Sequence, residues 1–110
     1  MYDMARRPQK HIFLYVLRLQ GGKYYVGQSR NLPDRIRKHF AGKGAVWTQL
    51  HAPLEVIKTI ELDTTSWVTA AVIETHLTLD LMKIYGTDNV RGGAYTGSRL
   101  PLDPDTYDEE

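Results

Sequence analysis

Residues 12–28 read Ile-Phe-Leu-Tyr-Val-Leu-Arg-Leu-Gln-Gly-Gly-Lys-Tyr-Tyr-Val-Gly-Gln, and this stretch decides the fold. Its first part, Ile12 to Leu19, is an apolar and aromatic run of strand length, which favours a buried strand over a helix. Gly21 and Gly22 supply the positive φ angles that a tight turn needs. We therefore predict that Lys23 to Gln28 returns antiparallel to the first strand.

A helix is predicted directly after this hairpin. Ser29 or Asn31 can cap it, and Pro33 fits its first turn. Leu32, Ile36 and either His39 or Phe40 recur at helical spacing, and the Gly-Lys-Gly stretch at 42–44 should end the helix.

The second half of the chain predicts one more strand and one long helix. Leu54 to Leu62 is rich in β-branched residues and partly alternating, as in a strand. Trp67 to Tyr85 carries apolar residues three and four apart, as in an amphipathic helix, and Gly86 can cap its end. Thr87 to Gly97 is Gly-rich and predicted to be irregular. The expected fold is α+β, a three-stranded antiparallel sheet flanked by helices.

The chain has the size and composition of one compact domain. It has 110 residues, of which 42% are hydrophobic and 25% charged. We predict a basic N-terminal arm (1–11), a single domain (12–97) and an acidic C-terminal tail (98–110). With no cysteine, disulfides and thiolate zinc sites are excluded, which favours an intracellular location in cytoplasm, nucleoid or nucleus. No run of eighteen apolar residues exists, so neither secretion nor membrane spanning is expected.

The formal net charge of +1 hides an uneven distribution. Five acids lie in the last eight residues, and without them the charge would be +6. Lys23 to Lys43 holds six basic residues against one acid, Asp34. Such a patch can meet phosphates, although an ordinary solvated basic face gives the same pattern.

Two segments of the hairpin carry a specific resemblance. Phe13 to Leu17 and Tyr25 to Gly27, with their tyrosines ten residues apart, are similar to the two signature strands of the GIY-YIG nuclease family. The likeness extends from Ile12 to Gly93, and Phe13 stands where the family has a leading glycine. Tyr24 should face the other side of the sheet. The positions that match the family's catalytic residues are Tyr15, Tyr25, Arg35, His39, Glu74 and Asn89.

The resemblance implies a role for each of these positions. Tyr15, preferred over Tyr25, would take the proton from the attacking water with help from His39. Tyr25 would orient the water or the phosphate. Arg35 would clamp the scissile phosphate, and Glu74 would bind Mg²⁺ or Mn²⁺. Asn89, the sixth position, would fix the local geometry.

The residue types support these roles independently of the family. Arg35 and His39 are four apart and share one face of a helix, so both can reach the same phosphate. Arginine offers a fork of donors to phosphate oxygens, and histidine exchanges protons near neutral pH. A carboxylate such as that of Glu74 is a suitable hard ligand for Mg²⁺. A tyrosine hydroxyl, with a pKa of about 10, needs help from its neighbours to act as a base.

A second group of residues is predicted to contact nucleic acid. Trp47 could stack on a base, or it could be a core residue that covers the sheet. Arg91, together with the amides of Gly92 and Gly93, could hold a phosphate. The full set of predicted nucleic-acid contacts is Lys23, Gln28, Arg30, Arg37, Lys38, Lys43, Trp47 and Arg91.

The leading functional hypothesis is a metal-dependent endonuclease acting on DNA. The alternatives are a nucleic-acid-binding module without turnover and a protein-interaction module. The chain is too short for an added DNA-recognition domain. Specificity would therefore come from branched or otherwise structured DNA, from a homodimer, or from a partner protein.

Overall fold

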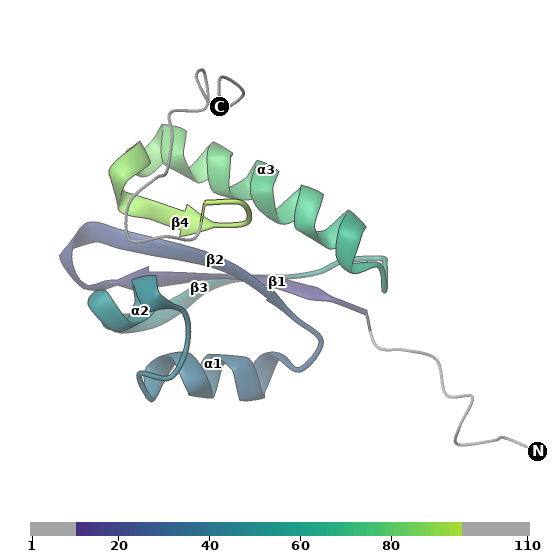
Figure 1. The fold of residues 1–110 in the computed structure, drawn as a ribbon, viewed down its shortest axis with the longest axis horizontal. Coiled ribbons are helices and arrows are strands. Elements are labelled where there is room, and N and C mark those ends of the chain that lie inside the picture. The colour runs from purple at the N-terminus through teal and green to yellow at the C-terminus, as the bar shows by residue number, and fades with distance from the viewer. Residues whose placement is uncertain (1–10, 96–110) are drawn as a thin grey trace, which may run out of the picture.

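The computed structural model describes residues 11–95, which form a mixed sheet between two helical layers (Figure 1). The sheet order is β3-β1-β2-β4. Helix α3 covers one face, here called the α3 face, and α1 and α2 cover the other, here called the α1 face. In chain order the elements are β1 (Phe13–Leu19), η2 (Gln20–Gly22), β2 (Lys23–Ser29), α1 (Leu32–Phe40), α2 (Val46–Leu50), β3 (Pro53–Glu61), α3 (Trp67–Tyr85), η3 (Thr87–Asn89) and β4 (Val90–Gly92).

The predicted hairpin is confirmed. Gly21 and Gly22 have φ angles of 76° and 72°, which turn the chain from β1 into β2. The antiparallel register pairs Tyr15 with Gly27 and Leu17 with Tyr25. Because paired residues share a face of the sheet, the Tyr15 and Tyr25 side chains lie on the same side, diagonal to each other.

Side chains along the hairpin alternate between the two faces of the sheet, so the core has two parts. On the α1 face, Tyr15, Leu17 and Tyr25 pack with Trp47 of α2. On the α3 face, Val16 and Val26 pack with Met82 of α3. Tyr24 also lies on the α3 side, where its ring stacks on Tyr85 at 3.9 Å, as predicted from its place beside Tyr25.

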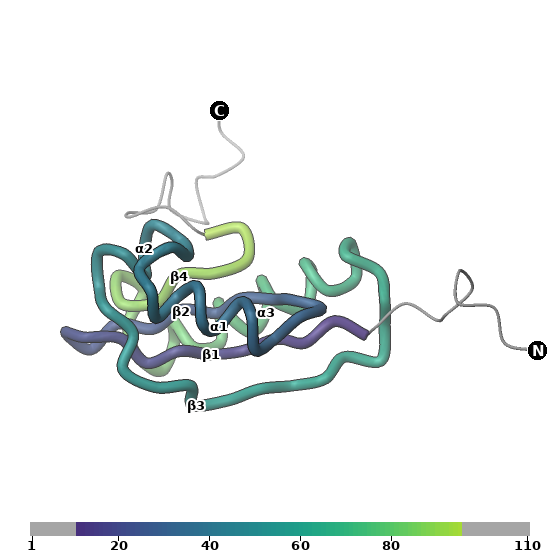
Figure 2. The backbone as a smooth tube through the Cα atoms, turned by 90° about the horizontal axis from the view of Figure 1, so that it is seen from below, coloured from purple at the N-terminus to yellow at the C-terminus, as the bar shows by residue number. Residues whose placement is uncertain are grey.

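Both long helices begin and end close to where the sequence predicts. The Asn31 side chain accepts a hydrogen bond from the Asp34 amide at the start of α1, and Ser66 does the same for Thr69 at the start of α3. Gly86, with a φ of 104°, ends α3. The third predicted strand is β3, which pairs antiparallel with β1 at one edge of the sheet (Figure 2).

The prediction of a three-stranded antiparallel sheet is wrong in one respect. The segment predicted to be irregular contains β4, which pairs parallel with β2 and makes the sheet four-stranded and mixed. With three residues, β4 is too short to show a period of two. The segment after α1 also contains the short helix α2, which was not predicted from the sequence. That helix has no side-chain cap that would mark its start.

Parts of the domain prediction lie outside the described residues. This holds for most of the basic arm (1–11), for the end of the predicted domain and for the acidic tail (98–110), so the predicted boundaries stay predictions. Among residues 11–95, no helix has the length and apolar character needed to cross a membrane.

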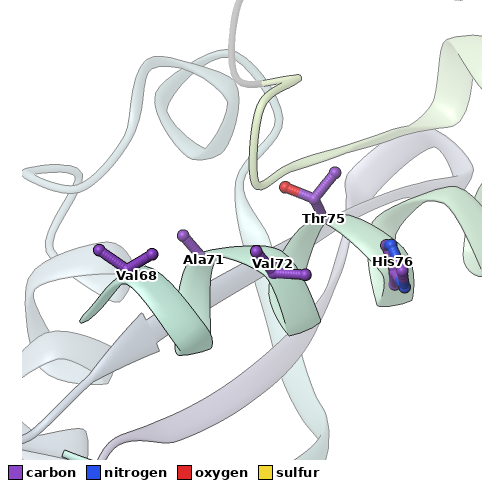
Figure 3. A pocket seen from close by; sticks show the side chains of 5 residues that line it. All are labelled: Val68, Ala71, Val72, Thr75 and His76. Carbon is purple, nitrogen blue, oxygen red and sulfur yellow. The ribbon is translucent and has the colours of Figure 1, made fainter. Parts of the chain in front are cut away.

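The face of α3 turned away from the sheet carries an open hollow of about 470 Å³ (Figure 3). Val68, Ala71, Val72, Thr75 and His76 line it, all from α3. Because three of the five are aliphatic and none is a carboxylate, arginine or lysine, the hollow is poorly suited to a phosphate or a hydrated metal ion.

Gly27 lies against the Tyr15 ring with no room for a side chain. A Cβ atom there would lie 2.3 Å from the Cζ and hydroxyl oxygen of Tyr15. We therefore expect Gly27→Ala to lower the free energy of unfolding by about 1–3 kcal/mol through overpacking. In a Tyr15→Ala background, which removes the ring, the same substitution should cost far less. Urea unfolding of the four proteins measures this coupling, and equal costs in both backgrounds would contradict it.

Candidate active site

Three rings meet on the α1 face of the sheet. The His39 ring, from the last turn of α1, lies 5.5 Å from the Tyr15 ring and 5.1 Å from the Tyr25 ring, centroid to centroid. The two tyrosine rings are 6.3 Å apart. His39 and Tyr15 are almost completely buried, and Tyr25 is 6% exposed. We call these residues the tyrosine–histidine cluster.

A short hydrogen bond joins the tyrosine of β1 to the histidine of α1. The Tyr15 hydroxyl lies 2.6 Å from Nε2 of His39. On the other side of the ring, Nδ1 of His39 lies 2.9 Å from Oγ1 of Thr48 in α2. Both ring nitrogens therefore have a partner, as a buried imidazole requires. The contact with Thr48 was not predicted, because a threonine nine residues from a histidine has no characteristic sequence pattern.

Arg35 brings a positive charge to the two tyrosines. It lies one helical turn before His39, and its guanidinium is close enough to interact with the Tyr15 and Tyr25 hydroxyls. Burial alone would lower the pKa of Arg35, but the contacts with both hydroxyls outweigh it and raise the pKa. Arg35 therefore keeps its charge beside two neutral acceptors.

Glu74 approaches the cluster from the opposite layer. It is only 6% exposed, and its Oε2 accepts a hydrogen bond from the Gly93 amide at 2.7 Å. Burial raises the pKa of Glu74, and the Gly93 amide partly offsets this. The negative charge of Glu74 in turn raises the pKa of both Tyr15 and Tyr25, so the carboxylate lies within electrostatic range of the two hydroxyls.

Burial keeps the proton-transfer groups of the cluster neutral. It raises the pKa of Tyr15 and Tyr25, so both are hydroxyls near pH 7. Burial, together with the charge of Arg35, lowers the pKa of His39 to about 4, so the imidazole is neutral near pH 7 and one of its ring nitrogens is a hydrogen-bond acceptor. The cluster thus combines a neutral base with a charged guanidinium.

Five of the six predicted catalytic residues gather in this way, and one does not. Asn89 accepts a hydrogen bond from Nζ of Lys23 at 2.8 Å and donates one to the Tyr85 carbonyl at 2.7 Å. It thereby ties the end of α3 to the start of β2. Its contacts connect parts of the fold and do not reach the tyrosine–histidine cluster.

The predicted nucleic-acid contacts fall into two groups. Arg37, Lys38 and Lys43 are exposed on or just after α1. The others are half-buried or buried and contact other parts of the fold. Gln28 pairs with Leu14 and so shares the α3 face, and Arg30 lies 4.5 Å above the Trp67 ring.

Of the two roles predicted for Trp47, the structure agrees with the core residue that covers the sheet and not with base stacking. Trp47 is 3% exposed, and the Arg91 guanidinium lies 4.6 Å above its ring. Its indole nitrogen donates to the Tyr24 carbonyl at 3.0 Å. Arg91 is itself buried and donates to the carbonyls of Thr87 and Val90. Both side chains are therefore part of the core beside Lys23, whose Nζ lies 6.0 Å from the Trp47 ring.

Glu74 is a fitting ligand for a hard divalent ion. Among residues 11–95, no group of three or more His, Cys, Asp or Glu side chains gathers around one point. A buried carboxylate carries a high desolvation cost, and no lysine or arginine of the described part of the chain lies within 4 Å of Glu74. One carboxylate with water as the remaining ligands is the coordination that Mg²⁺ usually has in proteins.

A comparison with known protein families finds a match that includes the hairpin. The family described as "GIY-YIG catalytic domain" matches residues 11–80, well over half of the chain. The chain belongs to the GIY-YIG family. The resemblance predicted from the sequence is thereby confirmed, and with it the assignment to a family of nucleases.

Several relatives carry the family name UPF0213, which states no activity. A UPF0213 protein of Cupriavidus necator is 34% identical over 62 residues, covering 56% of this chain and 67% of the relative. One of Cupriavidus pinatubonensis is 30% identical over 76 residues, covering 69% and 84%. One of Staphylococcus epidermidis is 35% identical over 48 residues, covering 44% and 57%. No solved structure gives a significant match.

The lowered pKa of His39 predicts a specific dependence of stability on pH. Below pH 6.5 the unfolded chain protonates His39, whereas the folded protein resists this until about pH 4. This effect alone should remove about 2 kcal/mol of stability between pH 7 and pH 5. We expect wild type to lose that much more than His39→Gln over this range in urea unfolding. Parallel losses in the two proteins would contradict a buried, neutral His39.

Proposed function

We propose that this protein is a divalent-metal-dependent endonuclease that hydrolyses phosphodiester bonds in DNA. The observation that carries the proposal is the meeting of Tyr15, Tyr25, Arg35 and His39 within electrostatic range of the buried Glu74. Family membership supports nuclease chemistry in general. An intracellular location is proposed with it, on the ground that the chain contains no cysteine.

The hydrogen bond from Tyr15 to His39 supplies a route for the proton of the attacking water. As the water oxygen bonds to phosphorus, its proton passes to the Tyr15 oxygen while the Tyr15 proton passes to Nε2 of His39. The tyrosine remains a hydroxyl in the product and the histidine becomes an imidazolium. The raised pKa of Tyr15 supports such a relay over a resting phenolate. The bond from phosphorus to the leaving oxygen then breaks, and solvent protonates that oxygen.

The charged residues stabilise the phosphate during this displacement. Arg35 is placed to donate to the non-bridging oxygens and to neutralise the charge that develops on them. Tyr25, beside it, orients the water or the phosphate. Glu74 would hold Mg²⁺ or Mn²⁺, which when bound polarises a phosphoryl oxygen and stabilises the leaving group. Asn89 supports the site at a distance by holding the end of α3 against β2.

DNA is the proposed substrate because the exposed charge near the cluster is basic. Arg37 and Lys38 lie on α1, the helix that carries Arg35 and His39, and Lys43 follows it. Phosphate contacts of this kind position a duplex without reading its sequence. Selection of branched or structured DNA would then depend on DNA shape, on a second copy of the chain, or on a partner protein.

Substitution of Glu74, the buried carboxylate of α3, tests the proposal most directly. With Mg²⁺ or Mn²⁺, the wild-type protein should cut plasmid or branched DNA, and Glu74→Gln should cut at least about 100-fold more slowly. The glutamine can still accept the Gly93 hydrogen bond, so the fold should persist. Asp80→Asn, an exposed carboxylate on the same helix, is the matched control and should cut at the wild-type rate.

Two outcomes would overturn the nuclease proposal. One is wild-type protein that cuts no DNA in either metal. The other is a Glu74→Gln variant that cuts as well as its parent. Salt-sensitive DNA binding without any cleavage would indicate the alternative, a binding module on the same fold.

The basic surface of α1 predicts how DNA binding depends on salt. Replacing both Arg37 and Lys38 by glutamine should weaken binding and reduce the slope of log K against log salt by about 2, close to 0.9 for each lost phosphate contact. Lys83→Gln, in the last turn of α3 on the other layer, should leave the slope unchanged. Titrations by fluorescence anisotropy at several salt concentrations measure this, and equal slopes in all three proteins would exclude α1 as the DNA-binding surface.

A further inference from the structure

We infer that Thr48 is a positioning residue that fixes His39 as the tautomer protonated on Nδ1, leaving Nε2 as the acceptor for the Tyr15 hydroxyl. The contribution of this arrangement to cleavage rests on the proposed nuclease function. The tautomer itself follows from hydrogen bonds within the protein and can be tested without a substrate.

The direction of the hydrogen bonds decides the tautomer. The Thr48 hydroxyl lies 2.8 Å from the Ala45 carbonyl oxygen, which can only accept. A hydroxyl has one hydrogen, so once it is donated to Ala45 the Thr48 oxygen must accept from Nδ1 of His39, at 2.9 Å. A neutral imidazole that donates from Nδ1 has its lone pair on Nε2, which faces the Tyr15 hydroxyl at 2.6 Å.

The start of α2 holds the threonine rigidly in this position. The Ala45 carbonyl also accepts the amides of Thr48 and Gln49, at 3.0 and 3.1 Å, as the first turn of the helix forms. Thr48 is 1% exposed, so no water competes freely for its hydroxyl. The same backbone turn that begins α2 thus directs the threonine hydrogen away from the histidine.

Gly44 makes the close approach of this turn to His39 possible. A Cβ at residue 44 would lie 2.1 Å from Nδ1 of His39 and 2.7 Å from its Cε1. Any side chain there would displace either the imidazole or the α2 turn. The glycine, the threonine and the histidine therefore form one unit that orients Nε2 toward Tyr15.

The consequence for catalysis is a relay with a defined direction. With Nδ1 protonated and bonded to Thr48, the only proton-accepting atom of the ring is the one bonded to Tyr15. The other tautomer would place a hydrogen on Nε2, and the Tyr15 hydroxyl could then no longer pass its proton to the ring. Partners that orient a functional histidine in this way commonly contribute about 10- to 100-fold to activity at metal sites.

The tautomer can be read directly by NMR of ¹⁵N-labelled imidazole. At pH 7 we expect His39 in the wild-type protein to carry its proton on Nδ1. Thr48→Ser keeps the hydroxyl and should keep this tautomer, whereas Thr48→Val removes it and should shift His39 toward the form protonated on Nε2. Tyr15→Phe should leave Nδ1 protonated, because in our inference Thr48 and not Tyr15 sets the tautomer.

Two NMR results would overturn the inference. One is a wild-type His39 protonated on Nε2. The other is a His39 that stays protonated on Nδ1 in Thr48→Val. If Thr48→Val fails to fold, as circular dichroism would show, the wild-type, Thr48→Ser and Tyr15→Phe spectra still decide, because a proton on Nε2 in any of the three contradicts the inference.

Cleavage kinetics then separate this inference from the nuclease proposal. Thr48→Val should lower kcat about 10- to 100-fold with KM and the salt dependence of DNA binding unchanged, and Thr48→Ser should restore kcat to within about threefold. A kcat unchanged in Thr48→Val would overturn the positioning role. Wild-type protein with the expected tautomer but no cleavage of any DNA would overturn the nuclease function and leave the role of Thr48 in setting the tautomer supported.

Discussion

The hydrogen bond between Tyr15 and His39 is the interaction on which the arrangement of the α1 face depends. It joins the central strand to α1 inside the core, where a polar group without a partner would be costly. Two close approaches make it possible, since Gly27 leaves room for the tyrosine ring and Gly44 leaves room for the imidazole. The buried pair therefore requires glycine at two positions that are far apart in the sequence, one in β2 and one in the loop between α1 and α2.

The same burial separates the groups of the site into neutral and charged ones. Desolvation favours the neutral forms of tyrosine and histidine, so a relay can start from a hydroxyl and an uncharged imidazole. Arg35 keeps its charge because the two hydroxyls beside it act as acceptors. Burial also raises the pKa of Glu74 and so disfavours its charged form, a penalty that a bound divalent cation would offset. In the proposed nuclease, a divalent ion held by Glu74 would balance this negative charge.

The sequence predicted the elements whose pattern is local and long enough to read. The hairpin, both long helices and β3 show glycine turns, caps or periodicity within a few residues. It missed β4, whose parallel partner β2 lies more than sixty residues earlier and whose length hides any alternation. For the site, the spacing of Tyr15 and Tyr25, the spacing of Arg35 and His39, and the family likeness supplied the candidates. Contacts between separate elements could not be predicted, and one example is the hydrogen bond between Thr48 and the His39 imidazole. Another is the stacking of Arg91 on Trp47, which places two predicted DNA contacts inside the core.

The strand that the sequence did not predict brings the Gly93 amide to the Glu74 carboxylate. β4 stops at Gly92, opposite Val26, so the next residue of β2, Gly27, has no strand on that side among the described residues. The chain continues as Gly93, whose amide no longer pairs with β2 and donates to Glu74. A side chain at Gly92 would collide with the Val26 carbonyl, which lies 2.6 Å from a Cβ built there. The short strand β4 therefore ends at Gly92, and Gly93 follows it beside Glu74 of α3, which lies within electrostatic range of the Tyr15 and Tyr25 hydroxyls.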